Sequence, residues 1–368
     1  MPSRSHMSSP YMEFAKLRSA AKYNLATSGI MSYPLSGLPV HIEDLEINGP
    51  NVHGGKYGYF PLIERIARYI GVSPDCVVTS AGTSMSNHLA MAATFDPGDE
   101  VLIEHPTYEL LESTALFLGA DLRRFERRFE DGFRIDPAEV ERNITSRTRL
   151  VILTNLHNPS GAYADETNIR AVGDIAKAHG ARVLVDEVYL ETFYGHRPRP
   201  ASEFGDHFLV TSSLTKAFGL SGVRCGWVLA SPELAERMWR MNDLFAATPA
   251  HPAETISVIA LDNLEKVAAR AKLLLDTNRK TMNSFLDSRK DIEFIRPHHG
   301  TIVFPKLRSG SVDDFLRLLR EKYETSAVPG HFFDMPQHFR VGIGGDTEMT
   351  RTGFERLATA LDEYGQAR

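Results

Sequence analysis

The chain has 368 residues, of which 42% are hydrophobic and 24% are charged, and its formal net charge is −6. These values are typical of a globular enzyme with one large core or two domains. An acidic balance argues against binding to nucleic acid, which requires a clustered basic face. No apolar run reaches the length of a membrane span, so we expect no membrane partner.

The N-terminus lacks the apolar core of a signal peptide. The tripeptide Ser5-His6-Met7 is typical of a cloning remnant, so residues 1–7 are left out of the fold prediction. The two cysteines, Cys76 and Cys225, cannot build a disulfide framework. Both features predict a cytoplasmic protein.

Segments with helical spacing alternate with short β-branched runs between about residues 60 and 230. We expect helices over 61–71, 84–95, 107–119 and 168–180, and strands over 77–80, 100–104, 150–155, 182–187, 207–213 and 225–230. This alternation predicts an α/β fold in which helices cover both faces of a mostly parallel sheet.

The pattern changes after about residue 230. Long helices are expected over 232–245 and 265–288, followed by strand-like segments over 293–307 and 339–344 and helices over 313–323 and 353–365. These elements predict a smaller α+β domain, and the N-terminal segment is expected to pack with it because chain ends often lie together. We therefore expect a large domain over 36–262 and a small domain made of 1–35 and 263–368.

Unusual polar residues follow five of the expected strands, at the edge where such sheets bind ligands. Each has an ordinary structural interpretation: Thr83 caps a helix, Tyr108 packs on the core, Asn158 belongs to a turn, Asp186 pairs with a structural arginine, and Lys216 is a solvated loop residue. A functional interpretation is open beside each of these.

The functional interpretation assigns complementary chemistry to these residues. The turn Ala81-Gly82-Thr83 opens a helix and forms an anion cradle. Tyr108 stacks on a flat ligand, and a buried Asp186 pairs with a ligand cation. Lys216 becomes a free amine that attacks carbonyls, and Arg224 supplies a planar fork for phosphate. Pyridoxal 5'-phosphate has the phosphate, protonated ring nitrogen, ring hydroxyl and aldehyde that this set requires.

With these residues the sequence resembles the class I/II aminotransferases, the fold-type-I family that includes aspartate aminotransferase. The resemblance extends from about residue 20 to the end and rests on six motifs in the family's order. They are the phosphate turn Ala81-Gly82-Thr83, Pro106 with Tyr108, Asn158 to Gly161, Asp186-Glu187 with Tyr189, Ser213 with Lys216 and Arg224, and Arg340 in the segment FRVGIG.

The resemblance implies a role for each matched residue. Lys216 links the cofactor as an imine and shuttles the proton. Asp186 keeps the pyridinium nitrogen protonated, Asn158 and Tyr189 hydrogen-bond the ring oxygen, and Tyr108 stacks on the ring. The phosphate is held by Ala81, Gly82, Thr83, Ser213 and Arg224, and the substrate by Gly29, Asn158 and Arg340. The implied reaction moves an amino group between an α-amino acid and a 2-keto acid.

The resemblance also implies a homodimer whose sites are completed across the interface. The family often carries a tyrosine five residues before the glycine that corresponds to Gly58, where this chain has His53. Either His53 or Tyr57 is therefore expected to reach the partner's phosphate.

The resemblance leaves other reactions of the same cofactor open. Lyases, decarboxylases and cyclising synthases use the same cofactor chemistry. We do not expect a non-catalytic sensor domain of a regulator, because only about 20 residues precede the segment YNLATSGI and the net charge is acidic. The segment GIGGD is a weak match to a nicotinamide site, and we take His298 and His299 as loop residues rather than metal ligands. No second substrate-facing arginine is evident, which disfavours a dicarboxylate and leaves neutral or aromatic amino acids open.

Overall fold

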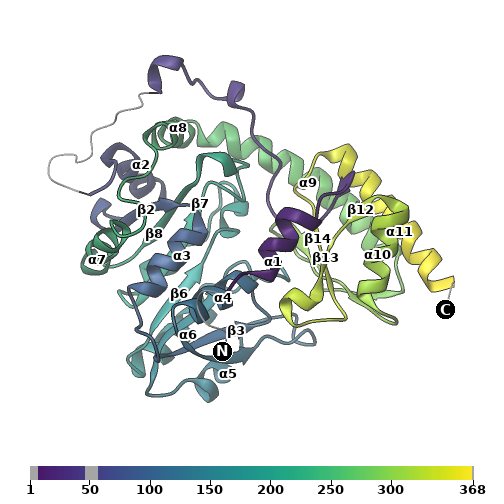
Figure 1. Ribbon diagram of the computed structural model, residues 1–368, viewed down its shortest axis with the longest axis horizontal. Coiled ribbons are helices and arrows are strands. Elements are labelled where there is room, and N and C mark those ends of the chain that lie inside the picture. The colour runs from purple at the N-terminus through teal and green to yellow at the C-terminus, as the bar shows by residue number, and fades with distance from the viewer. Residues whose placement is uncertain (1–6, 46–56, 367–368) are drawn as a thin grey trace.

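A seven-stranded sheet forms the centre of the molecule in the computed structural model, which describes residues 7–45 and 57–366 (Figure 1). Its strands lie in the order β2-β8-β7-β6-β5-β3-β4. Their bounds are β2 Val77–Ala81, β3 Glu100–His105, β4 Asp121–Glu126, β5 Thr148–Thr154, β6 Arg182–Asp186, β7 Phe208–Ser213 and β8 Cys225–Leu229. Only β8 runs antiparallel to its neighbours, so the prediction of a mostly parallel sheet is confirmed.

Helices pack around this sheet. They are α2 Phe60–Ile70, α3 Thr83–Ala92, α4 Glu109–Phe117, α5 Pro137–Asn143, α6 Glu166–Ala178, α7 Pro232–Asn242 and α8 His251–Asp262. Helix α3 contacts β2, β6, β7 and β8, and α6 contacts β6. Short 3₁₀ helices lie at Leu35–Gly37, Ile42–Asp44, Pro74–Cys76, Leu190–Phe193, Ala201–Phe204, Ser221–Val223 and Gly330–Phe333.

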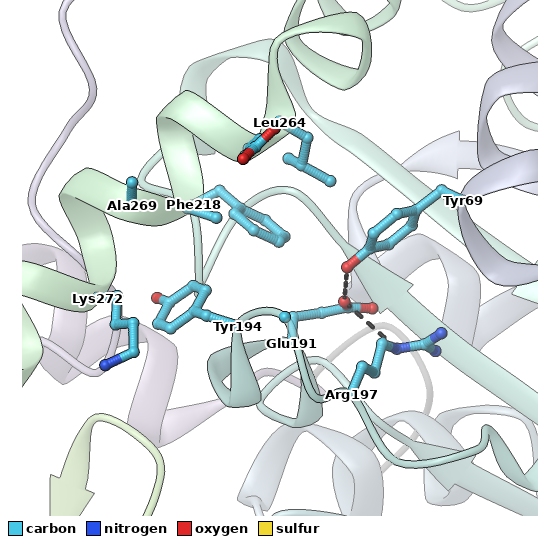
Figure 2. A pocket seen from close by; sticks show the side chains of 11 residues that line it. Tyr69, Glu191, Tyr194, Arg197, Phe218, Leu264, Ala269 and Lys272 are labelled. Atoms are coloured by element: carbon cyan, nitrogen blue, oxygen red, sulfur yellow. Dashed lines mark hydrogen bonds and ion pairs between the residues drawn. The ribbon is translucent and has the colours of Figure 1, made fainter.

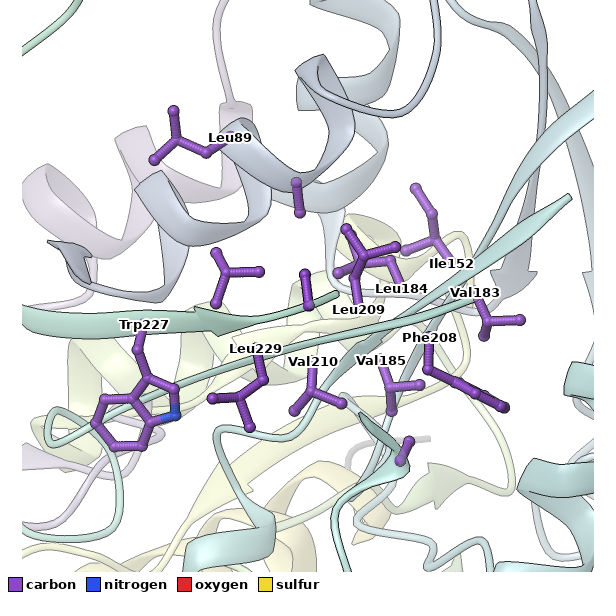
Figure 3. Packing of buried hydrophobic residues seen from close by; sticks show 14 of the residues in the cluster. Leu89, Ile152, Val183, Leu184, Val185, Phe208, Leu209, Val210, Trp227 and Leu229 are labelled. Carbon is purple, nitrogen blue, oxygen red and sulfur yellow. The ribbon is translucent and has the colours of Figure 1, made fainter. Parts of the chain in front are cut away.

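Both faces of the sheet are buried, which explains the nearly continuous apolar runs of the central strands. Figure 3 shows Leu89 of α3 on one side of the sheet, while Trp227, Val210 and Val185 point to the other side. All four side chains have no solvent exposure. The dense packing makes the sheet a rigid support for the loops at its edge.

The strand directions bring the predicted site residues to one edge. Strand β2 is antiparallel to β8, and β8 is antiparallel to β7, so β2 runs in the same direction as β5, β6 and β7. Their carboxyl ends therefore lie together, at Ala81, Thr154, Asp186 and Ser213. Arg224 joins them because β8 begins directly after it at this same edge.

The C-terminal elements form a second group around the long helix α9 Leu264–Ser288, with α10 Val312–Tyr323 and α11 Thr347–Gln366. Three small sheets accompany them, made of β1 Tyr23–Asn24 with β12 Thr325–Ser326, β9 Ile292–Glu293 with β11 Lys306–Leu307, and β10 Ile302–Val303 with β14 Phe339–Gly342 and β13 Val328–Pro329. Leu25 and Ile30 share a buried cluster with side chains of these helices. The domain bounds at 36–262 and at 1–35 with 263–368 stay a prediction.

Four larger elements lie outside the predicted ones: the N-terminal helix α1 Pro10–Glu13, which continues as a π-helical turn over Phe14–Arg18, and β4, α5 and α8. Figure 1 shows α1 between the sheet's helices and the C-terminal elements, beside α4 and β14. Among the described residues, no helix combines the length and apolarity that crossing a membrane requires.

Candidate active site

A cavity of about 210 Å³ opens at the carboxyl edge of the sheet. Seven residues predicted for the site line it, namely Thr83, Tyr108, Asn158, Asp186, Tyr189, Lys216 and Arg224. The remaining lining residues are Tyr11, Met12, Ala15, Ser28, Ser84, Asn87, Thr154, Val188 and Thr215. Residues from widely separated parts of the chain thus meet in one cavity.

Lys216 lies in the loop between β7 and β8, and its Nζ donates a hydrogen bond to Ser28 Oγ at 3.1 Å. No carboxylate among the described residues lies within ion-pair distance of this amine. The segment that carries Ser28 is held against the loop, because Ile30 N donates to the Lys216 carbonyl oxygen at 2.8 Å. Gly29 packs directly on the lysine, since a Cβ there would lie 3.4 Å from Lys216 Cδ, in ordinary van der Waals contact.

Asp186 ends β6 and is almost fully buried. Its Oδ2 accepts from Asn87 Nδ2 at 2.9 Å and its Oδ1 from Val188 N at 3.1 Å. Burial raises the pKa of Asp186 to about 6, while these hydrogen bonds and the Lys216 charge act in the opposite direction. The carboxylate has no cation in contact with it among the described residues, so it is suited to a cationic group of a ligand.

An anion cradle lies at the other end of the cavity, where α3 begins. Gly82 precedes the helix with φ +81°, and no side chain caps the helix N-terminus. Thr83 Oγ1 donates to Ser213 Oγ at 2.9 Å, and Arg224 Nη2 donates to the Ala81 carbonyl at 3.0 Å. Free helix N–H groups, hydroxyls and a guanidinium therefore converge where a phosphate is favoured.

The glycine at position 82 is required by this geometry. A Cβ there would lie 2.3 Å from Arg224 Nη2, and φ +81° is strained for other residues. Arg224 itself has φ +51°, an uncommon conformation for a residue with a side chain.

Arg340 lies on β14, with only 1% of its surface exposed. Its Nη1 donates to Asn158 Oδ1 at 2.8 Å, and its Nη2 donates to Tyr11 Oη at 2.6 Å. No carboxylate in the described part of the chain forms an ion pair with it. A buried guanidinium with neutral partners alone has an unmet demand for an anion.

Two aromatic rings complete the walls. Tyr108 directs its hydroxyl to Met12 Sδ at 3.4 Å, and burial raises the pKa of this phenol well above its usual value. Tyr189 is 4% exposed and follows Asp186 by three positions. Both rings line the cavity that also holds Lys216 and Asp186.

Tyr11 and Asn87 line the cavity but were not among the residues predicted from the sequence. Asn87 lies one helical turn after Thr83, and this spacing is a signal that it shares the helix face directed at the site. Its Oδ1 accepts from Thr211 Oγ1 at 2.6 Å, which fixes its amide toward Asp186. Tyr11 has no comparable signal, because α1 is four residues long.

A second cavity of about 410 Å³ is lined in part by Phe218, which follows Lys216 by two positions (Figure 2). Figure 2 shows Tyr194, Phe218 and Leu264 around it, with Glu191 between Tyr69 and Arg197 at its base. Glu191 accepts hydrogen bonds from Tyr69 and from Ser212, and Arg197 Nε lies 3.4 Å from its carboxylate. This buried network supports the chain segment that follows Asp186 and Tyr189.

Tyr57 and His53 are the two candidates for a contact with the cofactor phosphate of a partner subunit. The Tyr57 side chain is 45% exposed, and its ring stacks on that of Trp239 with centroids 6.3 Å apart. His53 lies outside the described residues.

The chain is similar to known proteins both in sequence and in fold. It is 26% identical over 358 residues to capreomycidine synthase of Streptomyces vinaceus, covering 95% of this chain and 92% of that protein. It is 27% identical over 339 residues to an aspartate aminotransferase of Sulfolobus acidocaldarius, covering 86% and 84%. Its fold matches a PLP-dependent aminotransferase from Streptococcus suis with a TM-score of 0.87 at 24% identity, over 94% of both chains. The expected fold type I is therefore confirmed.

The relatives imply pyridoxal 5'-phosphate as the cofactor, and the described residues fit this group. A Cβ at Gly82 would push the Arg224 guanidinium out of the cradle. The buried Asp186 carboxylate faces the cavity without a cation in contact among the described residues, and the Lys216 amine lies in the same cavity. The family model named aminotransferase class I and II matches residues 45–357. The chain belongs to the aminotransferase class I and II family.

Proposed function

We propose that this chain transfers an amino group between an α-amino acid and a 2-keto acid, with its chemistry centred on Lys216 and its substrate carboxylate bound by Arg340. The observation that carries the proposal is the buried Arg340 guanidinium, which has no anionic partner among the described residues and contacts the cavity residues Asn158 and Tyr11. A substrate α-carboxylate supplies the missing charge in a bidentate geometry.

Pyridoxal 5'-phosphate, when bound, supplies an aldehyde that condenses with amines and a ring that withdraws electrons from the substrate α-carbon. Ala81, Gly82, Thr83, Ser213 and Arg224 would hold its phosphate, since they form the anion cradle. Tyr108 would cover its ring, and Asn158 and Tyr189 would bond its ring oxygen.

The protein groups act on protons and charges. Lys216 Nζ would hold the cofactor, and as a free amine it would take the proton from the substrate α-carbon and return it during transfer. Asp186 would hold the protonated ring nitrogen of the cofactor, because a buried carboxylate gains most from a cationic partner. Arg340, Asn158 and Gly29 orient the substrate so that its α-hydrogen faces the lysine.

The substrate side chain is proposed to be neutral or aromatic. Apart from Lys216 and Arg224, the described residues that line the cavity include no cation, and the nearby walls are Met12, Ala15 and Val188. A second carboxylate would have no partner on these walls.

A test uses purified holoenzyme with a panel of amino acids and mass spectrometry of the products. Without an acceptor, transamination releases one equivalent of 2-keto acid per site, and with a 2-keto acid acceptor it becomes catalytic. Lys216→Ala should lose both activities and the visible absorbance of the bound cofactor, whereas Lys322→Ala, at an exposed lysine paired with Glu363, should keep them. An unchanged spectrum and turnover in Lys216→Ala would disprove the assignment.

A second candidate is another reaction of the same cofactor, such as cyclisation, elimination or decarboxylation. The observation behind this alternative is the similarity to capreomycidine synthase over 95% of this chain. This reaction would consume the amino acid without forming the corresponding 2-keto acid, so the same product analysis separates the two candidates.

We also propose that the protein is a cytoplasmic homodimer. Its cysteines Cys76 and Cys225 are free thiols, as in a reducing compartment. The large apolar side chains of Leu244 and Phe245 are 79% and 53% exposed, which suits burial against a second subunit. Sedimentation equilibrium should give twice the mass of the chain, and a monomer at assay concentration would contradict this proposal.

A further inference from the structure

Helix α1 brings a tyrosine from the beginning of the chain into the active-site cavity. Its first turn is capped by Ser9, whose Oγ accepts from Met12 N at 3.1 Å and also bonds the Glu109 carboxylate on α4. The Tyr11 side chain is 6% exposed, and its ring meets that of Tyr108 edge to face with centroids 5.5 Å apart. The phenol is therefore a fixed part of the cavity wall.

The Tyr11 hydroxyl shares the guanidinium that we assign to the substrate carboxylate. It accepts from Arg340 Nη2 at 2.6 Å, while Arg340 Nη1 donates to Asn158. Because the phenol oxygen is the acceptor in this contact, its hydrogen remains available to a further acceptor.

The same hydroxyl lies between two cations. Burial by itself raises the pKa of Tyr11, but the charges of Arg340 and Lys216 and hydrogen bonds with Arg340 and Ser28 lower the pKa below its usual value. Ser28 in turn accepts from Lys216 Nζ at 3.1 Å. Polar contacts therefore run from Arg340 through Tyr11 and Ser28 to the reactive amine.

We propose that Tyr11 is a further substrate-binding residue, whose hydroxyl donates a hydrogen bond to the carboxylate held by Arg340. The inference rests on the proposed function, in which Arg340 receives that carboxylate. An oxygen bound at Nη2 lies beside the phenol that contacts the same nitrogen, and an acidic phenol is a strong donor to an anion. Tyr11 thereby favours a carboxylate over a neutral amide at this position.

The experiment measures binding and needs no turnover. The holoenzyme is titrated by calorimetry with 3-phenylpropionate, which has a carboxylate and no amino group, and with 3-phenylpropionamide, which has a neutral amide instead. In Tyr11→Phe we expect the Kd for the carboxylate to rise about 10- to 100-fold, the effect of losing one hydrogen bond to a charged group. The Kd for the amide should change less than about twofold.

Three variants keep the result interpretable. Tyr323→Phe removes a hydroxyl that bonds Glu363 on the surface, so both affinities should be unchanged. Ser9→Ala loosens the cap of α1 but keeps the phenol, so it should not reproduce the loss. Arg340→Gln should abolish the preference for the carboxylate, and Tyr11→Phe should add little in that background.

Each outcome has one meaning. An unchanged carboxylate Kd in Tyr11→Phe, an equal loss for carboxylate and amide, or the full loss in Ser9→Ala would overturn the role of Tyr11. If Arg340→Gln also binds the carboxylate normally, the carboxylate site itself is misassigned and the proposed function fails. If Arg340→Gln loses the carboxylate while Tyr11→Phe keeps it, the inference alone fails.

Discussion

Replacing Asp186 by Asn should stabilise the cofactor-free protein at neutral pH, although it removes a proposed catalytic group. The carboxylate is 4% exposed and has two neutral hydrogen-bond donors, Asn87 and Val188. An asparagine keeps the shape of the side chain. Asn87 can turn its amide toward the new donor, since its present partner Thr211 is a hydroxyl that both donates and accepts.

The magnitude follows from the pKa of Asp186, which burial raises from 3.8 to about 6. This difference corresponds to about 3 kcal/mol at 1.36 kcal/mol per pH unit. Below pH 3.8 the group is protonated in both the folded and the unfolded chain and costs nothing. As the pH rises from about 4 to 6 the unfolded chain ionises first, so the cost grows and is complete above pH 6.

Urea unfolding of the two cofactor-free proteins between pH 4 and 8 tests this expectation. The free energy of unfolding of Asp186→Asn minus that of the original should rise by roughly 2.5 kcal/mol between pH 4 and pH 7, because the unfolded side chain is already partly ionised at pH 4. Buried acids that do not interact with Asp186, such as Glu254, are present in both proteins and cancel in the difference. A difference that stays constant with pH, or falls, would refute the reasoning about the uncompensated carboxylate.

Three further predictions concern the cradle, the carboxylate receptor and the core. Gly82→Ala should weaken cofactor binding at least tenfold by fluorescence titration, because its Cβ would lie 2.3 Å from Arg224 Nη2. Gly71→Ala is the control, since Gly71 also has a positive φ of +91° but has no heavy atom within 4 Å of the added Cβ. Equal cofactor affinities of the two variants would contradict this expectation. Arg340→Lys should raise the KM for amino and keto acids about tenfold or more in steady-state assays, because an ammonium cannot reproduce the fork, and an unchanged KM would count against the site. Arg127→Met should lower the free energy of unfolding by about 3–5 kcal/mol, because it leaves the buried Glu104 without its partner at 2.6 Å. Arg351→Met, which removes an exposed ion pair, is the control. Equal losses of stability in the two variants would show that burial is not the cause.

The alternation of strands and helices was predictable wherever an element carried a clear period or an apolar run. Strands β3, β5, β6 and β7 begin and end within two residues of the predicted bounds, since their side chains are buried on both faces. Strand β4, with the sequence DLRRFE, lies at the edge of the sheet and exposes charged side chains, so it lacks the apolar run of a central strand. Helix α5 is only seven residues long, and α8 is rich in β-branched residues, which weakens the helical signal of both.

The cofactor side of the site was predictable because its residues lie at the end of a strand or within three positions after it, and the strand fixes where these side chains lie. Asp186, Ser213 and Lys216 are of this kind. The substrate side was harder to predict from the sequence, because Tyr11 contacts Arg340, which lies 329 positions later in the chain. Helix α1, which carries Tyr11, is too short to show a hydrophobic period. Such a contact depends on how distant segments pack, and no local pattern encodes it.

The position of α1 has a practical consequence for protein engineering. Residues 7–9 run directly into the turn that carries Tyr11, and Ser9 is tethered to α4 beside the cavity. An affinity tag or a carrier protein fused close to Ser9 would crowd the entrance for substrates. The far end of α11, which Figure 1 shows well away from α1, is the better attachment point for immobilising this enzyme.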